Sequence, residues 1–373
     1  MSRVLVVTND FPPRPGGIQT FVYELVRRLD PDQVVVYTSK WKGWSEFDAA
    51  QPFPVIREDT SVLLPTPKVR RHAQDLMRAH DCGSVLFGAA GPLGLLAPAL
   101  RTTGADRIVA MTHGHEAGWA QLPGPRQMLR RIGDGVDTVT YLGEYTRKRI
   151  ASALSPAAAG RMVRLTPGVD TDVFRPDAGG EAIRQRYGLT DRPVVVCVSR
   201  LMPRKGQDTL IRALPLIQRQ VPDAALLLVG GGPYRKKLVR MAERSGSARD
   251  VVFTGSVPWD ELPAHYAAGD VFAMPCRTRR AGLDVEGLGI VFLEASATGL
   301  PVVAGDSGGA PDAVVDGETG FIVDGEIEQT VSCLSRLAKD PIGSGGLGQS
   351  GRAWVKQCWD WAQQASELSQ LVR

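Results

Sequence analysis

Short apolar runs alternate with segments of helical periodicity from the amino end of the chain onward. Residues 4–8 form a continuous apolar run, as in a parallel strand buried on both faces. A loop rich in Pro and Gly follows, and apolar positions then recur at helical spacing over 19–29. Further strands are predicted at 34–38, 84–87, 107–112 and 138–142, with helices that include 70–80 and 144–154. This alternation is typical of a doubly wound α/β unit.

The pattern restarts after an irregular stretch at 165–176, which we interpret as a hinge. The second series of elements predicts strands at 194–199, 225–229, 251–254, 271–274, 302–304 and 320–323, and a helix at 208–218. The sequence therefore predicts two Rossmann-like lobes, 1–168 and 169–354, and a helical end at about 355–373 that crosses back to the first lobe. We expect ligands in the cleft between the lobes, which strand carboxyl ends and helix amino ends should face.

Composition supports two globular cores and excludes several classes of protein. Of the 373 residues, 43% are apolar and 23% are charged, and no apolar run approaches the roughly 18 residues that suggest a membrane span. The amino end reads as a strand and not as a signal peptide, so we expect a cytoplasmic protein. The five cysteines include no C-x-x-C pair, which argues against a zinc site or a disulfide framework.

The excess of basic residues lies in the first half of the chain. Residues 1–170 carry five more basic than acidic side chains, whereas 171–373 carry one more acidic than basic. Such an excess favours contact with an anionic membrane surface or an anionic acceptor, although it also fits a solvated surface. It is too small to indicate nucleic-acid binding.

Two loops that follow predicted strands carry features suited to phosphate. Gly16 and Gly17 precede the first helix, where backbone N–H groups and the helix dipole favour an anion, although a tight turn uses the same residues. Arg200 and Lys205 share the loop after the first strand of the second lobe. An arginine can grip oxygens bidentately and a lysine acts as a point charge, which together suit a diphosphate. The alternative is a solvated loop.

Two further stretches carry side chains suited to sugar hydroxyls. Glu286 and Glu294 lie eight residues apart, and the stretch Gly287–Leu288–Gly289 predicts that Glu286 lies on a loop and Glu294 in a helix. The alternative is a helix with two solvated glutamates. Backbone amides between the carboxylates can face a phosphate. His113 and His115 follow a strand of the first lobe and can bind a hydroxyl or a phosphate. With one nearby glutamate they make a poor metal site, so no metal is predicted.

Taken together, these motifs resemble those of the retaining GT-B glycosyltransferases of family four. The Arg200-x4-Lys205 pair, the Glu286-x7-Glu294 pair and the Gly16–Gly17 loop occur in the family's order over nearly the whole chain. The stretches NDFPPRPGGIQTF, THGHE and SRLMPRKGQDTLI are similar to a group of actinobacterial members that transfer mannose from GDP-mannose to phosphatidylinositol monomannoside. The resemblance implies an α/β GT-B fold, with two parallel sheets facing each other across a donor-binding cleft.

The resemblance also implies a role for each matching residue. Arg200 and Lys205 would neutralise the leaving diphosphate, which the amides of Gly16 and Gly17 would also face. Glu286 would bind hexose hydroxyls and Glu294 ribose hydroxyls. His113 would lie beside the sugar and β-phosphate, with His115 as the second choice for that role. Asp10 would contact the acceptor or the transferred sugar. Leu288, Gly289 and Ile290 would contact the donor, and the backbone near Ser256 and Val257 would contact the guanine.

The expected reaction is same-face attack by the acceptor hydroxyl, because no motif supplies the carboxylate nucleophile that a double displacement needs. No metal and no cofactor are expected, since Arg200 and Lys205 would replace a cation. A lipid-linked acceptor implies peripheral contact with the anionic inner face of the plasma membrane. Candidate contacts are Lys68, Arg70, Arg71 and Arg78, then Arg126, Arg130 and Arg131 beside Leu122, Met128, Leu129 and Ile132, and the segment 41–44.

Other classes of protein share parts of this pattern. A dinucleotide oxidoreductase would need G-x-G-x-x-G after the first strand of a lobe, and the run Gly230–Gly232 lies in a later turn. A sugar-nucleotide epimerase of the same fold would convert the donor without an acceptor. A non-enzymatic nucleotide-sugar sensor would bind GDP without turnover. A family-four enzyme that uses another nucleotide sugar or another acceptor would share every motif.

Overall fold

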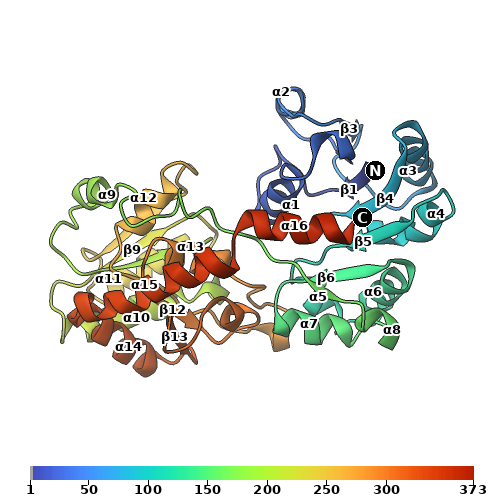
Figure 1. Ribbon diagram of the computed structural model, residues 1–373. Helices are drawn as coiled ribbons and strands as arrows, with labels where there is room; N and C mark the ends of the chain where they lie inside the picture. Colours follow the sequence, from blue (N-terminus) through green and yellow to red (C-terminus); the bar gives the residue numbers. More distant parts are fainter. Residues whose placement is uncertain (1–2) are drawn as a thin grey trace. The chain divides into compact units, whose positions relative to one another are not determined.

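The computed structural model describes residues 3–373, and for 341–344 the backbone alone. The described chain forms two compact units. The first contains the residues through Gly168 together with Trp361–Arg373, and the second contains Val169–Asp360. In each unit helices cover a sheet of parallel strands (Figure 1), which confirms the predicted α/β class.

The sheet of the first unit has seven parallel strands in the order β3-β2-β1-β4-β5-β6-β7. Its interior strand β1 contains three valines, a leucine and a threonine, all buried, after its exposed first residue. Residues of β1 pair with β2 on one side and with β4 on the other. The strands are β1 (Arg3–Thr8), β2 (Val34–Ser39), β3 (Val55–Glu58), β4 (Cys82–Phe87), β5 (Arg107–Ala110), β6 (Thr138–Tyr141) and β7 (Val163–Arg164).

Helix α1 shows why the sequence pattern of this unit predicts its structure. Its apolar residues at helical spacing, among them Phe21, Val22 and Leu25, are all buried. The helices are α1 (Gly17–Val26), α2 (Trp44–Ala49), α3 (Pro67–Ala79), α4 (Ala97–Arg101), α5 (Glu116–Trp119), α6 (Pro123–Gly135), α7 (Glu144–Ala151), α8 (Pro156–Ala159) and α16 (Trp361–Leu371), with short 3-10 turns η1 (Pro31–Gln33) and η2 (Leu93–Leu96).

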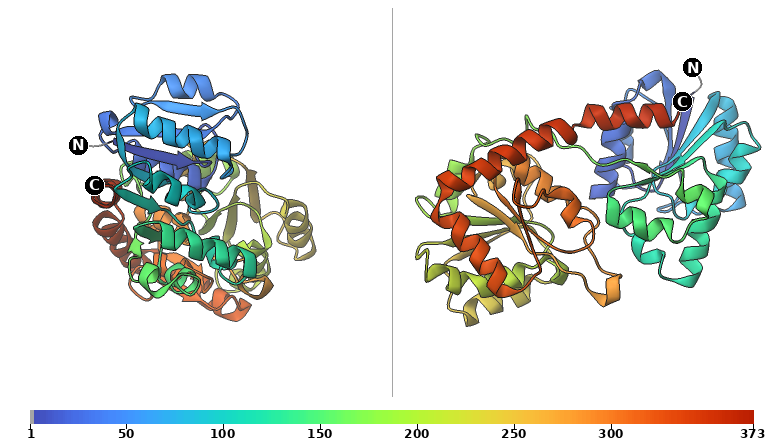
Figure 2. Two further views of the ribbon diagram at one scale, coloured as in Figure 1. Left: turned by 90° about the vertical axis from the view of Figure 1, so that its right-hand side faces the viewer. Right: turned by 60° about the horizontal axis from the view of Figure 1, so that its bottom comes forward.

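The sheet of the second unit has six parallel strands in the order β10-β9-β8-β11-β12-β13. Strand β8 is central and every one of its residues is buried. Helices lie on both faces of this sheet as well (Figure 2). The strands are β8 (Val194–Val198), β9 (Ala225–Val229), β10 (Val251–Gly255), β11 (Val271–Met274), β12 (Val302–Gly305) and β13 (Gly320–Val323). The helices are α9 (Gly180–Tyr187), α10 (Gln207–Gln218), α11 (Arg235–Arg244), α12 (Leu262–Ala267), α13 (Ile290–Ala297), α14 (Ile327–Lys339) and α15 (Pro341–Cys358), with η3 (Pro203–Lys205), η4 (Arg280–Gly282) and η5 (Ala310–Ala313).

The carboxyl-terminal helical segment departs from the prediction. The second unit extends through α15 to Asp360, and only α16 packs in the first unit, so the crossover placed at about 355 occurs later. The physical reason lies in two tryptophans. Trp359 is buried in the second unit, edge-on to Trp354. Trp361 packs against Phe21 of α1 in the first unit. The two tryptophans therefore anchor the two sides of the junction between α15 and α16 in different cores.

The first six strands of each unit have the same order relative to the chain, with the first strand third from one edge of its sheet. In such a sheet the connections turn to opposite sides on either side of the first strand, and ligands bind beyond the strand carboxyl ends at that point. The switch lies between β1 and β4 in the first unit and between β8 and β11 in the second. The candidate residues after these strands therefore occupy the expected ligand edge of each sheet.

Among the described residues, no helix combines the length and the apolar character needed to cross a membrane.

Candidate active site

The two predicted cations of the loop after β8 lie in different environments. Arg200 is exposed directly after the strand, whereas Lys205, at the end of η3, has only 8% of its surface exposed. Gly206 joins η3 to α10 with a φ of +79°, and a Cβ there would lie well inside van der Waals contact with the carbonyl oxygen of Pro275. Only glycine combines this backbone conformation with so close a neighbour, so Gly206 fixes the path of the loop beside Lys205.

The structure brings Lys205 and Glu286 together. The Nζ of Lys205 lies 2.7 Å from Oε2 of Glu286, and Nη1 of Arg204 donates to the same oxygen at 2.8 Å. The Nε of Arg204 also lies 3.1 Å from Oδ1 of Asp284. Burial alone would raise the pKa of Glu286, but the two cations outweigh it and hold the pKa below its ordinary value. Arg204 was not predicted as a site residue, because its partner Glu286 lies 82 positions away in the sequence.

Glu286 is held on its loop by backbone contacts. The N–H of Gly309 donates to its carbonyl at 2.9 Å. Gly308 and Gly309 lie so close to the carbonyls of Glu286 and Gly287 that neither position has room for a Cβ. The Glu286 side chain runs toward Gly289, where an added Cβ would lie 3.5 Å from its Cγ. The carboxylate is therefore fixed near the start of α13.

The start of α13 provides backbone donors. Gly289 is the residue before the helix, with a φ of +81°, Ile290 is the first helical residue, and Leu288 is buried. The first N–H groups of a helix have no partner within it, and they form the positive end of the helix dipole. This arrangement suits an anionic group of a ligand, as the sequence predicted for residues 288–290.

Glu294, the predicted ribose contact, lies within helix α13. It is only 4% exposed, and its Oε2 accepts a hydrogen bond of 2.6 Å from the hydroxyl of Tyr266. Burial raises the pKa of Glu294 to about 7, although the Tyr266 hydroxyl acts in the opposite direction. The carboxyl group therefore changes its charge near neutral pH.

Replacing Glu294 with Gln is expected to change how stability depends on pH. A group whose pKa is raised on folding stabilises the protein fully below its unfolded pKa, and this contribution disappears as the pH rises through the folded value. For Glu294 the window runs from 4.5 to about 7. Urea unfolding across this window should show the wild type losing roughly 1–3 kcal/mol more than the variant. The control is Glu318→Gln, which makes the same change at an exposed position. If the free energies of unfolding of Glu294→Gln and wild type differ by the same amount at every pH, the raised pKa of Glu294 is contradicted.

The ends of β8, β9 and β10 pack closely, and glycines make this possible. Gly230 and Gly232 approach the carbonyls of Ser199 and Leu201 with no room for a Cβ, and the N–H of Leu201 donates to Gly231 at 2.9 Å. The run is thus a turn, as predicted, and it supports the loop of Arg200. Val257, the predicted guanine contact, follows β10 and is half-buried.

In the first unit, Asp10 and the paired glycines lie in one loop after β1. The Nε2 of Gln19 donates to Oδ1 of Asp10 at 2.6 Å, and the Asp10 N–H donates to the Thr8 hydroxyl at 2.9 Å. Gly16 and Gly17 are exposed, and Gly17 is the first residue of α1. The amide groups at this helix start are therefore available to an anion.

His113 is held firmly, whereas His115 is exposed. The Nε2 of His113 lies 2.5 Å from the carbonyl oxygen of Gly88, and its backbone N–H donates to Glu116 at 2.9 Å. Burial lowers the pKa of His113, so the ring is neutral at physiological pH. Its Nδ1 is buried without a hydrogen-bond partner among the described residues. No group of three His, Cys, Asp or Glu side chains in the described part of the chain has the arrangement of a metal site.

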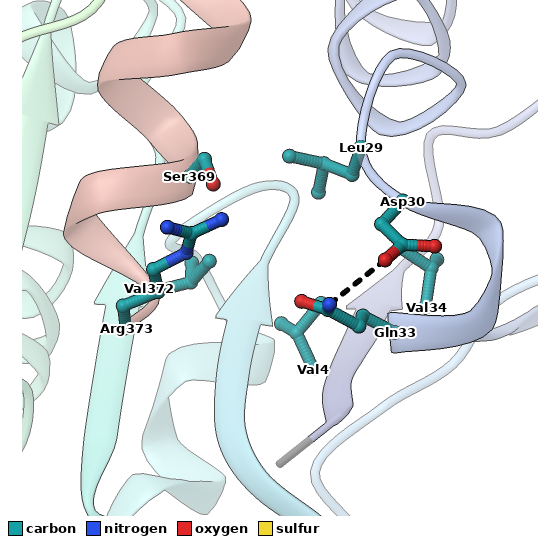
Figure 3. A pocket seen from close by; sticks show the side chains of 8 residues that line it. All are labelled: Val4, Leu29, Asp30, Gln33, Val34, Ser369, Val372 and Arg373. Carbon is teal, nitrogen blue, oxygen red and sulfur yellow. Dashed lines mark hydrogen bonds between the residues drawn. The ribbon is translucent and has the colours of Figure 1, made fainter. Parts of the chain in front are cut away.

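A pocket of 310 Å³ in the first unit lies away from these residues. It is bounded by Val4 and Val34 at the amino ends of β1 and β2, and by Ser369 of α16 and the two residues after that helix (Figure 3). The Nε2 of Gln33 donates to Oδ2 of Asp30, another lining residue, at 2.8 Å. Because Asp10 and His113 follow the carboxyl ends of their strands, this pocket is at the opposite edge of the sheet.

Comparison with known proteins gives matches over both units. Residues 180–354 match the family described as glycosyl transferases group 1, and 15–173 match glycosyltransferase family 4. The chain is 54% identical, over 99% of its length and 98% of the relative, to the GDP-mannose-dependent alpha-(1-6)-phosphatidylinositol monomannoside mannosyltransferase of Mycolicibacterium smegmatis. It is 43% identical, over 100% of its length and 98% of the relative, to the GDP-mannose-dependent monoacylated alpha-(1-6)-phosphatidylinositol monomannoside mannosyltransferase of Corynebacterium glutamicum.

Among solved structures, HepE of Anabaena in complex with UDP superposes with a TM-score of 0.81, at 20% identity over 99% of this chain and 98% of that one. That similarity shows the fold. With the two family matches and the full-length relatives, it establishes that the chain belongs to the family 4 and group 1 glycosyltransferases and has their GT-B fold.

Proposed function

We propose that the protein transfers mannose from GDP-mannose to phosphatidylinositol monomannoside, a step of phosphatidylinositol mannoside biosynthesis. The observation that carries this proposal is the 54% identity, over nearly the full length of both chains, to a mannosyltransferase of that name. The paired charges at Lys205 and Glu286 support it, because they provide an anion site and a hydroxyl acceptor side by side.

The second unit is proposed to hold the leaving group. As the bond between the mannose C1 and the phosphate oxygen breaks, negative charge grows on the diphosphate. Lys205, with Arg200, would stabilise that charge, and the amides at the start of α13 would add backbone donors. Glu286 now accepts from both Arg204 and Lys205. When the diphosphate shares Lys205, Arg204 still neutralises Glu286, whose second oxygen can accept from a hexose hydroxyl.

The acceptor hydroxyl is proposed to attack C1 on the face that the diphosphate leaves. A new bond forms between C1 and the acceptor oxygen, and the acceptor proton passes to the departing phosphate. His113 would contribute a neutral ring held in place near the sugar, because its Nε2 contacts the carbonyl oxygen of Gly88. Asp10, anchored by Gln19, would contact the acceptor or the transferred sugar.

The proposed reaction needs neither a metal nor another cofactor. Purified protein is incubated with radiolabelled GDP-mannose or UDP-glucose, each with and without phosphatidylinositol monomannoside, and each mixture is run with and without excess chelator. Label should enter the lipid from GDP-mannose alone, at a rate that chelator leaves unchanged. Consumption of UDP-glucose instead, donor conversion without acceptor, or loss of transfer in chelator would each contradict a stated part of the proposal.

A lipid acceptor also requires contact with the inner face of the plasma membrane, and the first unit offers a suitable surface. Trp41, Trp44, Val62 and Leu64, here called the aromatic patch, are exposed in the segments that follow the neighbouring strands β2 and β3, with Trp44 as the first residue of α2. Arg14 lies 5.0 Å from the centre of the Trp41 ring, and Lys40 lies 5.3 Å from that of Trp44. Tryptophan beside lysine or arginine favours an anionic lipid interface.

Replacing both Trp41 and Trp44 with Ala is expected to reduce binding to vesicles of phosphatidylcholine and phosphatidylglycerol about 10-fold, because the rings no longer enter the interface. Transfer to acceptor presented in detergent should stay near the wild-type rate. Sedimentation with vesicles measures the binding. The control is Trp259→Ala, which removes an exposed tryptophan of the second unit. Equal vesicle binding by the double variant and the control would rule out the aromatic patch as the docking surface.

A further inference from the structure

Arg277, just after β11, holds the chain on both sides of Lys205. Its backbone N–H donates to the carbonyl of Arg204 at 2.8 Å. Its Nη2 lies 2.8 Å from each carboxylate oxygen of Asp208, and its Nη1 donates to the Thr209 hydroxyl at 3.2 Å. The backbone of Arg277 therefore binds the residue before Lys205, and its side chain binds two residues of the first turn of α10.

Asp208, the carboxylate that Arg277 neutralises, is buried close to the proposed diphosphate site. Asp208 is buried in the first turn of α10, three residues after Lys205. Its other cationic neighbour, Arg212, is 3.5 Å away and has half its side chain exposed, so water screens that pair. Arg277 is thus the main counter-charge of a carboxylate beside the proposed diphosphate site. A buried carboxylate without its partner would repel a diphosphate.

We propose that Arg277 is a positioning residue for donor binding: it fixes the loop of Lys205 and neutralises Asp208, so that the diphosphate meets a net positive site. This inference rests on the proposed function, in which Lys205 holds the diphosphate of GDP-mannose. Arg277 acts through Asp208 and the loop and needs no contact with the donor. A run of arginines at 277, 279 and 280 otherwise resembles an ordinary solvated segment.

The test compares Arg277→Gln, Asp208→Asn and the double variant in calorimetric binding of GDP and in steady-state transfer from GDP-mannose. Arg277→Gln should weaken GDP binding and raise the KM for GDP-mannose roughly 10-fold or more, with a smaller change in kcat, because it leaves Asp208 without its partner. Removing the carboxylate in the double variant should restore most of the GDP affinity, and Arg277→Lys should restore part of it. A merely structural contact would give no such recovery of affinity.

Thermal unfolding of each variant separates loss of affinity from loss of fold, and Arg212→Gln, which removes the exposed partner of Asp208, should bind GDP like the wild type. Wild-type GDP affinity in Arg277→Gln, or a double variant no better than Arg277→Gln, would overturn the inference. Lys205→Met is measured alongside. If it binds GDP as the wild type does, the proposed role of Lys205 fails; if it loses affinity while Arg277→Gln does not, only the role of Arg277 fails.

Discussion

Replacing Lys205 with Met should lower kcat/KM for GDP-mannose on the order of 10²–10³-fold, the usual effect of removing one charged or hydrogen-bonding group at a leaving oxyanion. Lys205 is nearly buried and lies 2.7 Å from Glu286. Methionine has a similar length and fills the same space without the charge. The substitution therefore removes the cation from a site where water cannot replace it, and it leaves Glu286 with Arg204 alone.

The matched control is Lys356→Met, which makes the same chemical change at an exposed position of α15. It should retain wild-type transfer. Steady-state kinetics with varied GDP-mannose measure both variants, and thermal unfolding checks that each is folded. A folded Lys205→Met protein within about threefold of wild-type kcat/KM would contradict the role given to this lysine.

Replacing Gly206 with Ala should be nearly as damaging. A left-handed backbone costs an alanine about 1–2 kcal/mol, and here the new Cβ also meets the carbonyl oxygen of Pro275. Relief requires the loop to move, and that movement displaces Lys205 directly beside it. We expect stability to fall by about 2–4 kcal/mol and transfer to fall at least 10²-fold in whatever protein remains folded.

Gly188→Ala separates the cost of a left-handed backbone from the effect of the close contact with Pro275. Gly188 ends α9 with a φ of +66°, and no atom lies within 4 Å of where its Cβ would be. This variant should lose about 1 kcal/mol of stability and no activity. Urea unfolding and transfer assays on both variants give the comparison. Equal losses in the two would show that the close approach to Pro275 has no effect of its own.

The fold was predictable where burial leaves a clear pattern. Strands such as β8, buried along their whole length, appear in the sequence as unbroken apolar runs. Two strands were missed for a physical reason: β3 is half-buried and carries charged residues, and β7 is two residues long at the sheet edge. The position of the carboxyl-terminal crossover was misjudged because three nearby tryptophans look alike in sequence but belong to two cores.

The site was predictable only as far as each loop could be considered alone. Arg200, Lys205 and Glu286 each follow a recognisable strand or precede a helix. Arg204 and Arg277 were not predicted, because their importance comes from partners 82 and 69 positions away. No local pattern distinguishes an arginine that neutralises a buried carboxylate from one that lies in solvent. The pairing of Lys205 with Glu286 likewise required the fold.

The most direct test of the central claim is the structure of the product. Purified protein, GDP-mannose and phosphatidylinositol monomannoside are incubated in chelator, and the product lipid is examined by NMR. We expect one additional mannose in α-(1-6) linkage, with the anomeric configuration of the donor retained. A β-linked mannose, a different linkage, or mannose released to water with no lipid product would contradict it.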